Sequence, residues 1–80
     1  MEIEISGFAF KPDTLTIPSG TTVTWTNLDG PPHTVTTLET QYDSGWLSTG
    51  DIFSYTFDGN STYEYYCTIH PFMKATIIVE

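Results

Sequence analysis

The chain has 80 residues, of which 39% are apolar and 15% aromatic, so it supports a single domain, expected over residues 1–80, with a small core. Its formal net charge of −8, from ten acidic residues against Lys11 and Lys74, excludes nucleic acid as a partner, because the phosphate backbone would repel it. No apolar stretch approaches the roughly 20 residues that cross a bilayer, so we expect no membrane span in this chain.

Apolar and aromatic residues alternate with polar ones along most of the chain, which is the period of half-buried strands. Together with the content of Thr, Val, Ile and Tyr, the alternation predicts seven short strands, at residues 3–6, 14–17, 21–27, 33–38, 51–57, 61–67 and 74–80. No segment has a helical period. Seven short strands predict an all-β sandwich.

The clearest hairpin in the sequence joins residues 51–57 to residues 61–67. Asp58-Gly59-Asn60 lies between them, and Gly and Asn can take the positive φ values that tight turns require. The alternation through the second of these strands places Cys67 on the inward face, at the end of the strand.

The segment Cys67-Thr68-Ile69-His70-Pro71-Phe72-Met73 places a thiol, an imidazole and a thioether at C-x2-H-x2-M spacing. Because neighbouring donors are three residues apart, a tight loop at the strand end can turn all three toward one point. His33 follows Pro31-Pro32, whose fixed φ angles restrict the backbone before it, and it can reach the same end of the molecule.

Two imidazoles and a thiolate in a plane, with a weak thioether bond along the axis, form the ligand set of a blue-copper electron-transfer site. The residues that would provide it are His33, Cys67, His70 and Met73. Nitrogen ligands suit Cu(II) and soft sulfur suits Cu(I), so one copper ion per chain could change oxidation state with little rearrangement. Zinc is the competing metal, but structural zinc sites use four strong Cys or His ligands and have little use for Met.

Each of these residues has an ordinary structural explanation when it is taken alone. A Cys at an inward strand position commonly acts as a small apolar side chain, a loop residue such as His33 could be solvated, and Met73 could fill the core. The conjunction favours the metal, because the chain has one Cys, two His and one Met besides Met1, and all lie where strand ends could converge.

These residues resemble the cupredoxins, and among them the amicyanins, whose ligand loop has this short spacing rather than the longer one of the plastocyanins. The resemblance covers nearly the whole chain, through the further segments Phe8-Ala9-Phe10-Lys11-Pro12, Gly20-Thr21-Thr22-Val23-Thr24-Trp25-Thr26-Asn27 and Pro32-His33. It implies an eight-stranded Greek-key β-sandwich with copper at one end. It also implies a periplasmic or other extracytoplasmic protein.

The resemblance further implies how partners bind. In the cupredoxins the surface ligand, here His70, lies within an apolar patch through whose edge electrons pass, and the candidates for that patch are Pro32, Pro71 and Phe72. We expect a monomer whose redox partners, an electron donor and an acceptor, dock there. The acidic residues are scattered without a run, so they need only keep the surface soluble, although a basic partner remains open.

One position departs from the family pattern. Thr34 follows His33 where the family commonly has Asn, whose hydrogen bonds brace the ligand loop near the Cys sulfur. We therefore expect Thr34 to brace the loop less completely and to alter the reduction potential or the rigidity of the site.

Four other functions can be weighed against electron transfer. A copper enzyme such as a multicopper oxidase needs further His ligands, and a thiol hydrolase built on Cys67 would lack a Gly-rich oxyanion loop, so we expect no catalytic activity. A copper storage or delivery protein could use the same ligands and stays open. A purely structural β-sandwich would fail to bind copper.

Overall fold

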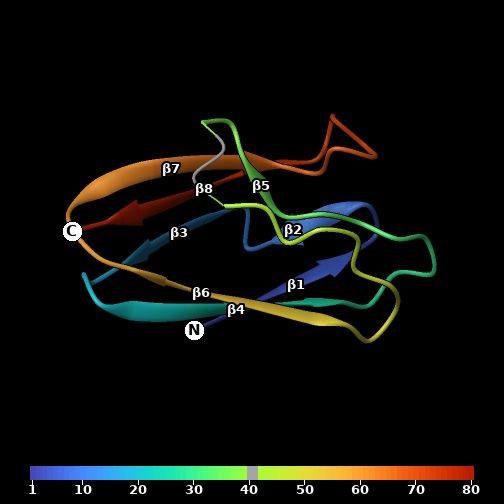
Figure 1. The fold of residues 1–80 in the computed structure, drawn as a ribbon, viewed down its shortest axis with the longest axis horizontal. Helices are drawn as coiled ribbons and strands as arrows, with labels where there is room; N and C mark the ends of the chain where they lie inside the picture. The colour runs from blue at the N-terminus through green and yellow to red at the C-terminus, as the bar shows by residue number, and fades with distance from the viewer. Residues whose placement is uncertain (40–41) are drawn as a thin grey trace.

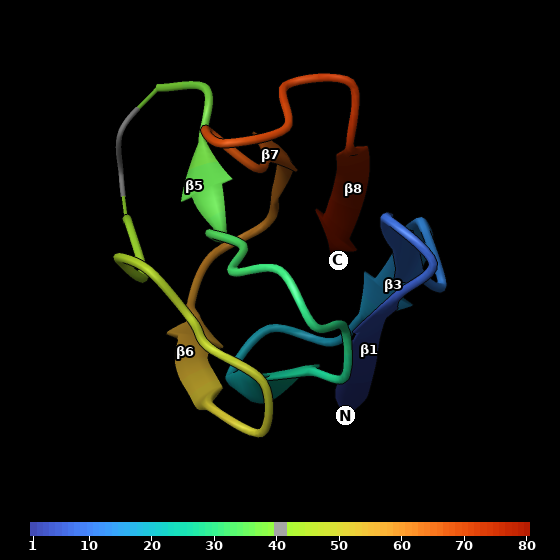
Figure 2. The same cartoon turned by 90° about the vertical axis from the view of Figure 1, so that its right-hand side faces the viewer.

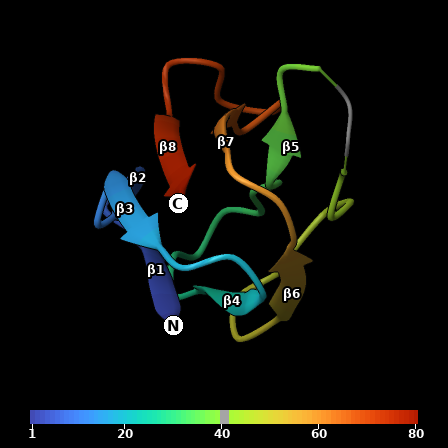
Figure 3. The same ribbon diagram turned by 90° about the vertical axis from the view of Figure 1, so that its left-hand side faces the viewer.

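The computed structural model describes residues 1–39 and 42–80. The described residues form eight strands: β1 (Glu2–Ser6), β2 (Ala9–Lys11), β3 (Thr14–Ile17), β4 (Thr21–Asn27), β5 (Thr36–Thr37), β6 (Ile52–Phe57), β7 (Ser61–Tyr66) and β8 (Lys74–Val79). They make two four-stranded sheets, with the strand orders β2-β1-β4-β6 and β3-β8-β7-β5, and the two layers face each other (Figures 1 and 3). The predicted all-β sandwich is confirmed. None of the described residues belongs to a helix long and apolar enough to span a membrane.

The core lies between the inner faces of the two sheets, as the alternation in the sequence requires. Its fully enclosed side chains include Ile5 of β1, Trp25 of β4 and Ile77 of β8. The ring of Trp25 packs edge-on against Tyr65 of β7, with 5.5 Å between ring centroids, so a single indole joins the two layers. Such aromatic contacts let a short chain bury enough apolar surface to fold.

One strand prediction was wrong in its extent. Residues 33–38 were expected to form one strand, but only Thr36–Thr37 does, pairing with β7, while His33 makes an isolated bridge with Leu47. Between them Val35 exchanges hydrogen bonds with Ser44, whose Oγ accepts from Val35 N and whose N donates to Val35 O. A loop therefore takes up the backbone groups that a neighbouring strand would have used.

Strand β2 was not predicted. It has three residues, with Phe10 facing the core, and Pro12 follows it directly. So short a run gives little alternation, and the following proline reads as a turn.

The predicted hairpin between residues 51–57 and 61–67 was also wrong. Strand β6 pairs with β4, and β7 pairs with β5 and β8, so the connection crosses from one sheet to the other. Gly59 does adopt a positive φ of 83°. Both strands turn aromatic side chains toward the core, and the rings of Phe57 and Tyr63 contact each other across it, with centroids 5.1 Å apart and planes tilted by 59°, rather than side by side in one sheet.

The loops at one end of the sandwich bring together four segments that are distant in sequence: the β1–β2 turn, the residues after β4, those before β6, and the β7–β8 connection (Figures 1 and 2). Backbone hydrogen bonds tie them, from Leu28 N to Ile5 O at 2.8 Å and from Gly50 N to Asn27 O at 2.7 Å. The C-terminus lies at the opposite end (Figure 1). Every predicted metal ligand lies in the segments at the loop end.

Candidate metal centre

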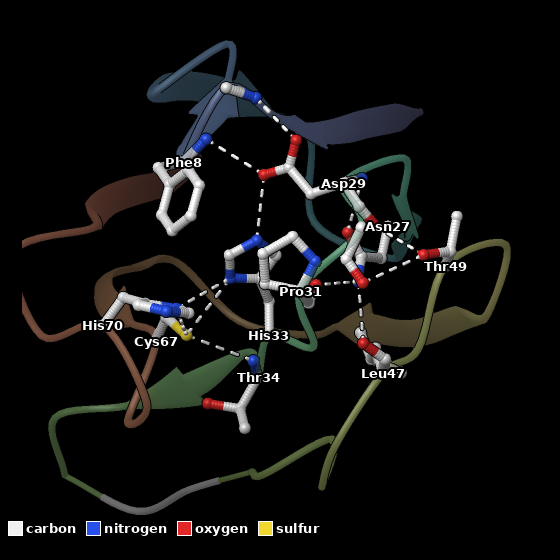
Figure 4. A network of polar contacts seen from close by, with 12 residues as sticks. Phe8, Asn27, Asp29, Pro31, His33, Thr34, Leu47, Thr49, Cys67 and His70 are labelled. Atoms are coloured by element: carbon white, nitrogen blue, oxygen red, sulfur yellow. Dashed lines mark hydrogen bonds and ion pairs between the residues drawn. The ribbon is translucent and has the colours of Figure 1, made fainter.

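Three donor atoms face one another at this end of the molecule (Figure 4). The Nδ1 atoms of His33 and His70 are 3.2 Å apart, and Sγ of Cys67 lies 3.6 Å from the first and 3.8 Å from the second. A single ion with bonds of about 2.0–2.1 Å to nitrogen and about 2.3 Å to sulfur, as zinc has, could contact all three at once. Within the described residues these three side chains form a group that could hold a metal ion.

The fold delivers two of these donors from rigid, buried backbone. His33 exchanges both backbone hydrogen bonds with Leu47, at 3.1 and 2.7 Å, and Cys67 follows β7 directly. Both side chains are 0% exposed. The backbone of the sandwich therefore holds both residues in place.

The β7–β8 connection closes on itself and carries the remaining candidates. Cys67 N donates to Met73 O at 3.1 Å, and Met73 N donates to His70 O at 2.9 Å. Met73 lies beside Cys67 in the backbone and its side chain is 2% exposed, while His70 is half-buried at the mouth of the site. The predicted tight loop is thus present, with its thioether on the inside.

Asp29 orients the His33 ring from behind (Figure 4). Its Oδ2 lies 2.9 Å from His33 Nε2, and an ionised carboxylate can only accept a hydrogen bond, so Nε2 carries the proton. In a neutral imidazole that leaves the lone pair on Nδ1, the nitrogen that faces Cys67 and His70. The carboxylate therefore prepares His33 to bind a cation.

Asp29 is itself held by main-chain donors. Burial alone would raise the pKa of its carboxyl, but hydrogen bonds from the backbone N–H groups of Phe8 and Gly7 and from His33 outweigh burial and hold that pKa below its usual value. The two backbone bonds measure 2.9 and 2.8 Å. The group stays ionised near neutral pH, as its role requires.

Asn27 supports the backbone on both sides of Asp29. Its Nδ2 donates to Leu47 O at 2.7 Å and to Pro31 O at 3.2 Å, and its Oδ1 accepts from Asp29 N at 2.9 Å. The side chain is 0% exposed. A buried amide with these three bonds joins the segments that carry His33 and its orienting carboxylate.

Phe8 covers the two imidazoles from the β1–β2 turn. Its ring lies edge-on to His33 at 5.5 Å and to His70 at 4.9 Å, and it stacks on Phe72 at 6.3 Å. The turn places Gly7 and Phe8 at φ values of 60° and 58°, and a positive φ is costly for a phenylalanine. The contact with two rings and the hydrogen bond to the carboxylate behind them offset that cost.

Asp29 and Phe8 were not predicted as parts of the site. An acid four residues before a candidate ligand was the available signal for Asp29, and a glycine ahead of an aromatic was the signal for a turn at Phe8. Neither signal says which segment the turn would face.

Two residues of the predicted apolar patch, Pro71 and Phe72, lie beside His70. Phe72 is 69% exposed, Pro71 is exposed and Pro32 is half-buried. Phe8, 40% exposed, adds a second aromatic ring to this surface, which we call the aromatic rim: Phe8, Pro71 and Phe72 beside His70.

The chemistry of the donors fits a transition metal. Two imidazole nitrogens and one sulfur converge with no side-chain carboxylate among them, and a thioether lies on the same loop. Soft sulfur donors together with imidazole suit copper in both of its oxidation states. Zinc could span the same three atoms, so the donor triangle alone does not distinguish the two metals.

Comparisons with known proteins distinguish them. The family model described as copper binding proteins, plastocyanin/azurin family, matches residues 1–80. Amicyanin-alpha of Methylorubrum extorquens is 34% identical over 99% of this chain, which spans 71% of that relative. The amicyanin of Paracoccus denitrificans is 31% identical over 98% of the chain, which spans 63% of its length, less than two thirds.

Solved structures agree with this family. A purple cupredoxin from Nitrosopumilus maritimus superposes with a TM-score of 0.92 and 33% identity, covering 99% of this chain and 98% of that one. A copper-containing nitrite reductase from Thermus scotoductus has a TM-score of 0.93 and 30% identity, covering all of this chain but 22% of that one. From the match over its whole length and the convergence of its donors, this chain belongs to the copper-binding plastocyanin/azurin family, the cupredoxins.

Proposed function

We propose that this protein carries one electron at a time between redox proteins through a single type 1 copper site. The proposed ligands are His33, Cys67, His70 and Met73. The observation that carries the proposal is the triangle of donor atoms, with edges of 3.2, 3.6 and 3.8 Å.

Copper, when bound, supplies the one-electron Cu(II)/Cu(I) couple. The residues of the chain exclude water from the site and hold it in one geometry. Cys67 and His33 are fully buried, and the Asp29 carboxylate and the backbone bridge to Leu47 fix the His33 ring on two sides. A site that is held in place by the fold needs little rearrangement when its charge changes, which favours fast transfer.

We propose the aromatic rim as the surface through which electrons enter and leave. His70 is the one candidate ligand of the donor triangle that is not fully buried, and the rim residues Phe8 and Phe72 lie 4.9 and 6.2 Å from its ring. Exposed aromatic surface of this kind is typical of protein contact sites.

The remaining features of the proposal rest on the family. We propose a single copper domain over residues 1–80 that acts as a monomer, in the periplasm or another extracytoplasmic compartment, and that has no catalytic activity of its own.

The visible spectrum after addition of Cu(II) tests the site. The wild type is expected to bind one copper per chain and to show an intense thiolate-to-copper band, which Cys67→Ser should lack because a hydroxyl cannot replace the thiolate. Met73→Leu is the matched variant, expected to keep the band while changing its position. Absence of the band in the wild type would overturn the proposal.

Stopped-flow oxidation of the Cu(I) form separates electron transfer from copper delivery. An electron carrier exchanges electrons rapidly and holds its metal against a chelator, and the burial of His33 and Cys67 supports that outcome. Sluggish exchange together with ready loss of copper would favour delivery instead.

A further inference from the structure

Thr34 and Thr68 join the two segments that carry the candidate ligands. Thr34 follows His33, and Thr68 follows Cys67. Thr68 N donates to Thr34 Oγ1 at 2.9 Å, and the two hydroxyl oxygens are 3.1 Å apart. In addition Thr34 N donates to Cys67 Sγ at 3.3 Å, so the same residue that joins the segments also places a donor on the sulfur.

The chain of hydrogen-bonded side chains continues beyond Thr34. Its Oγ1 lies 3.1 Å from Thr36 Oγ1, and Thr36 Oγ1 donates to Asp43 Oδ1 at 3.2 Å. The two inner hydroxyls belong to buried residues, with Thr34 2% and Thr36 4% exposed. The Asp43 oxygen also accepts from Gly45 N at 2.9 Å, which holds the carboxylate in place at the protein surface.

The carboxylate sets the direction of every hydrogen bond in this chain of hydroxyls. An ionised carboxylate only accepts, and a threonine hydroxyl has one proton to give, so Thr36 spends its proton on Asp43. Thr34 must then donate to Thr36, and the Thr68 hydroxyl must donate to Thr34. Thr34 Oγ1 accepts two hydrogen bonds and donates one, which uses its full capacity.

A fully committed hydroxyl cannot turn toward another partner. These hydrogen bonds hold the Thr34 side chain in one rotamer. By holding the residue, they also keep its main-chain N–H in position to donate to Cys67 Sγ. Hydrogen bonds to the cysteine sulfur are among the factors that tune the potential of a blue-copper site. Asp43, at the surface, can therefore influence the hydrogen bond to Cys67 Sγ through the buried hydroxyls of Thr36 and Thr34.

We propose that Thr36 and Asp43 are positioning residues for the sulfur side of the metal centre, acting through the hydrogen-bonded chain Asp43–Thr36–Thr34 on the donor to Cys67. The inference deepens the proposed copper function and rests on it for two of its three measurements. Its physical content is the acceptor that Asp43 provides, not the charge that it adds to the surface.

A double-mutant cycle tests this. Thr36→Val removes the middle hydroxyl at nearly constant volume, and Asp43→Ala removes the terminal acceptor. The measured quantities are the position of the thiolate-to-copper band, the reduction potential, and the hydrogen-exchange rate of the Thr68 amide in the metal-free protein. Each single variant is expected to shift the first two in the same direction and to speed the exchange by about threefold or more.

The double variant is expected to match Thr36→Val alone, because either change breaks the same chain. Asp43→Asn should remain near the wild type, since its side-chain oxygen can still accept from Thr36. Asp58→Ala is the control for charge alone, because Asp58 lies in the exposed β6–β7 connection, and it is expected to leave the band and the Thr68 exchange unchanged.

Additive shifts in the double variant, or equal effects of Asp43→Asn and Asp43→Ala, would overturn the proposal, because either result means that Asp43 acts by charge. Urea unfolding of each metal-free variant shows that it folds, and Thr34→Ser, which keeps the hydroxyl, should retain the wild-type band. If the wild type bound no copper, the proposed function would fail, yet the Thr68 exchange would still decide the hydrogen-bonded chain.

Discussion

At the scale of single residues, the site depends on polar side chains that orient the donors. Asp29 accepts hydrogen bonds from His33 Nε2 and from the backbone of Gly7 and Phe8, so one carboxylate determines both the ring orientation of a candidate ligand and the position of the turn above it. Mutation of a residue that orients a metal ligand typically lowers metal affinity by about 10–100-fold.

Asp29→Asn is expected to lower copper affinity by about 10–100-fold. The amide has one acceptor oxygen in place of two, so it cannot serve His33 and both backbone donors together. Competition with a chelator of known affinity measures the change. Asp51→Asn is the control, since Asp51 accepts from Ser48 N and does not contact His33; equal losses in the two variants would contradict the orienting role of Asp29.

Tyr42 makes a second prediction at this scale. It is 7% exposed, and its phenol oxygen has no hydrogen-bonding partner among the described residues. Burial, followed by the neighbouring Tyr65, Tyr55 and Tyr63, raises the pKa of Tyr42 above its ordinary value. The unfolded chain therefore releases this proton first as pH rises above about 10, so the free energy of unfolding falls there.

Tyr42→Phe should remove that part of the alkaline dependence, which amounts to at most about 1.4 kcal/mol per pH unit for one proton. Near pH 7 the phenol of Tyr42 is protonated in both the folded and the unfolded wild type, and the substitution removes no hydrogen bond. The variant should therefore be close to the wild type in stability at that pH. Urea unfolding of the metal-free protein at pH 7 and pH 11 compares them. If the variant loses as much unfolding free energy between pH 7 and pH 11 as the wild type does, Tyr42 is not the cause of the alkaline loss of stability.

At the scale of elements, the β1–β2 turn is more than a connection. It carries Phe8 over both imidazoles and supplies two backbone donors to Asp29. The turn requires positive φ at both Gly7 and Phe8, so the chain keeps an unfavourable backbone conformation where the aromatic ring is needed.

Two substitutions at Phe8 separate the ring from the backbone conformation. Phe8→Ala keeps the strained φ and removes the ring contacts, which should cost about 0.5–1.5 kcal/mol of unfolding free energy and speed the loss of copper to a chelator. Phe8→Gly also loses the ring but relieves the φ, and should be about 1–2 kcal/mol more stable than Phe8→Ala. Phe72→Ala, at a residue 69% exposed, is the control. Equal stability of the two Phe8 variants would refute the strain.

The sequence predicted the strands better than it predicted their pairing. Alternation identified β4 and β8, because inward-facing apolar residues such as Trp25 in β4 and Ile77 in β8 recur at every second position of each strand. It could not say that β6 and β7 belong to different sheets, because a glycine turn such as that at Gly59 serves a hairpin and a crossing equally well. Pairing depends on which faces the whole sandwich buries.

The candidate ligands were predictable for a related reason. The spacing of Cys67, His70 and Met73 places three donors on one loop, so their convergence is a local property. Asp29 and Phe8 reach the site from segments more than 20 residues apart along the chain, and only the assembled loops bring them together. Local spacing reveals ligands, whereas the residues that orient and cover them follow from tertiary structure.

At the scale of the whole molecule, the net charge of the protein has to be distinguished from the apolar surroundings of the site. The candidate ligands lie at one end of the sandwich, behind the aromatic rim, while the net charge is −8. The rim itself carries no acidic side chain, so the surface next to His70 is apolar. The field of the whole protein nevertheless acts on any charged reagent that approaches the rim.

The rate of Cu(I) oxidation by small reagents should therefore depend on salt with a sign set by the reagent. Between about 0.01 and 0.15 M ionic strength the Debye length falls from about 30 Å to about 8 Å, which removes most of the attraction or repulsion. Oxidation by hexacyanoferrate(III), an anion, should become faster with salt, and oxidation by tris(phenanthroline)cobalt(III), a cation, should become slower. Replacing Glu2 and Glu4 by Gln changes the net charge from −8 to −6 and should weaken both dependences. If salt instead slowed oxidation by hexacyanoferrate(III) and speeded oxidation by tris(phenanthroline)cobalt(III), charges near the site, rather than the field of the whole molecule, would govern the approach.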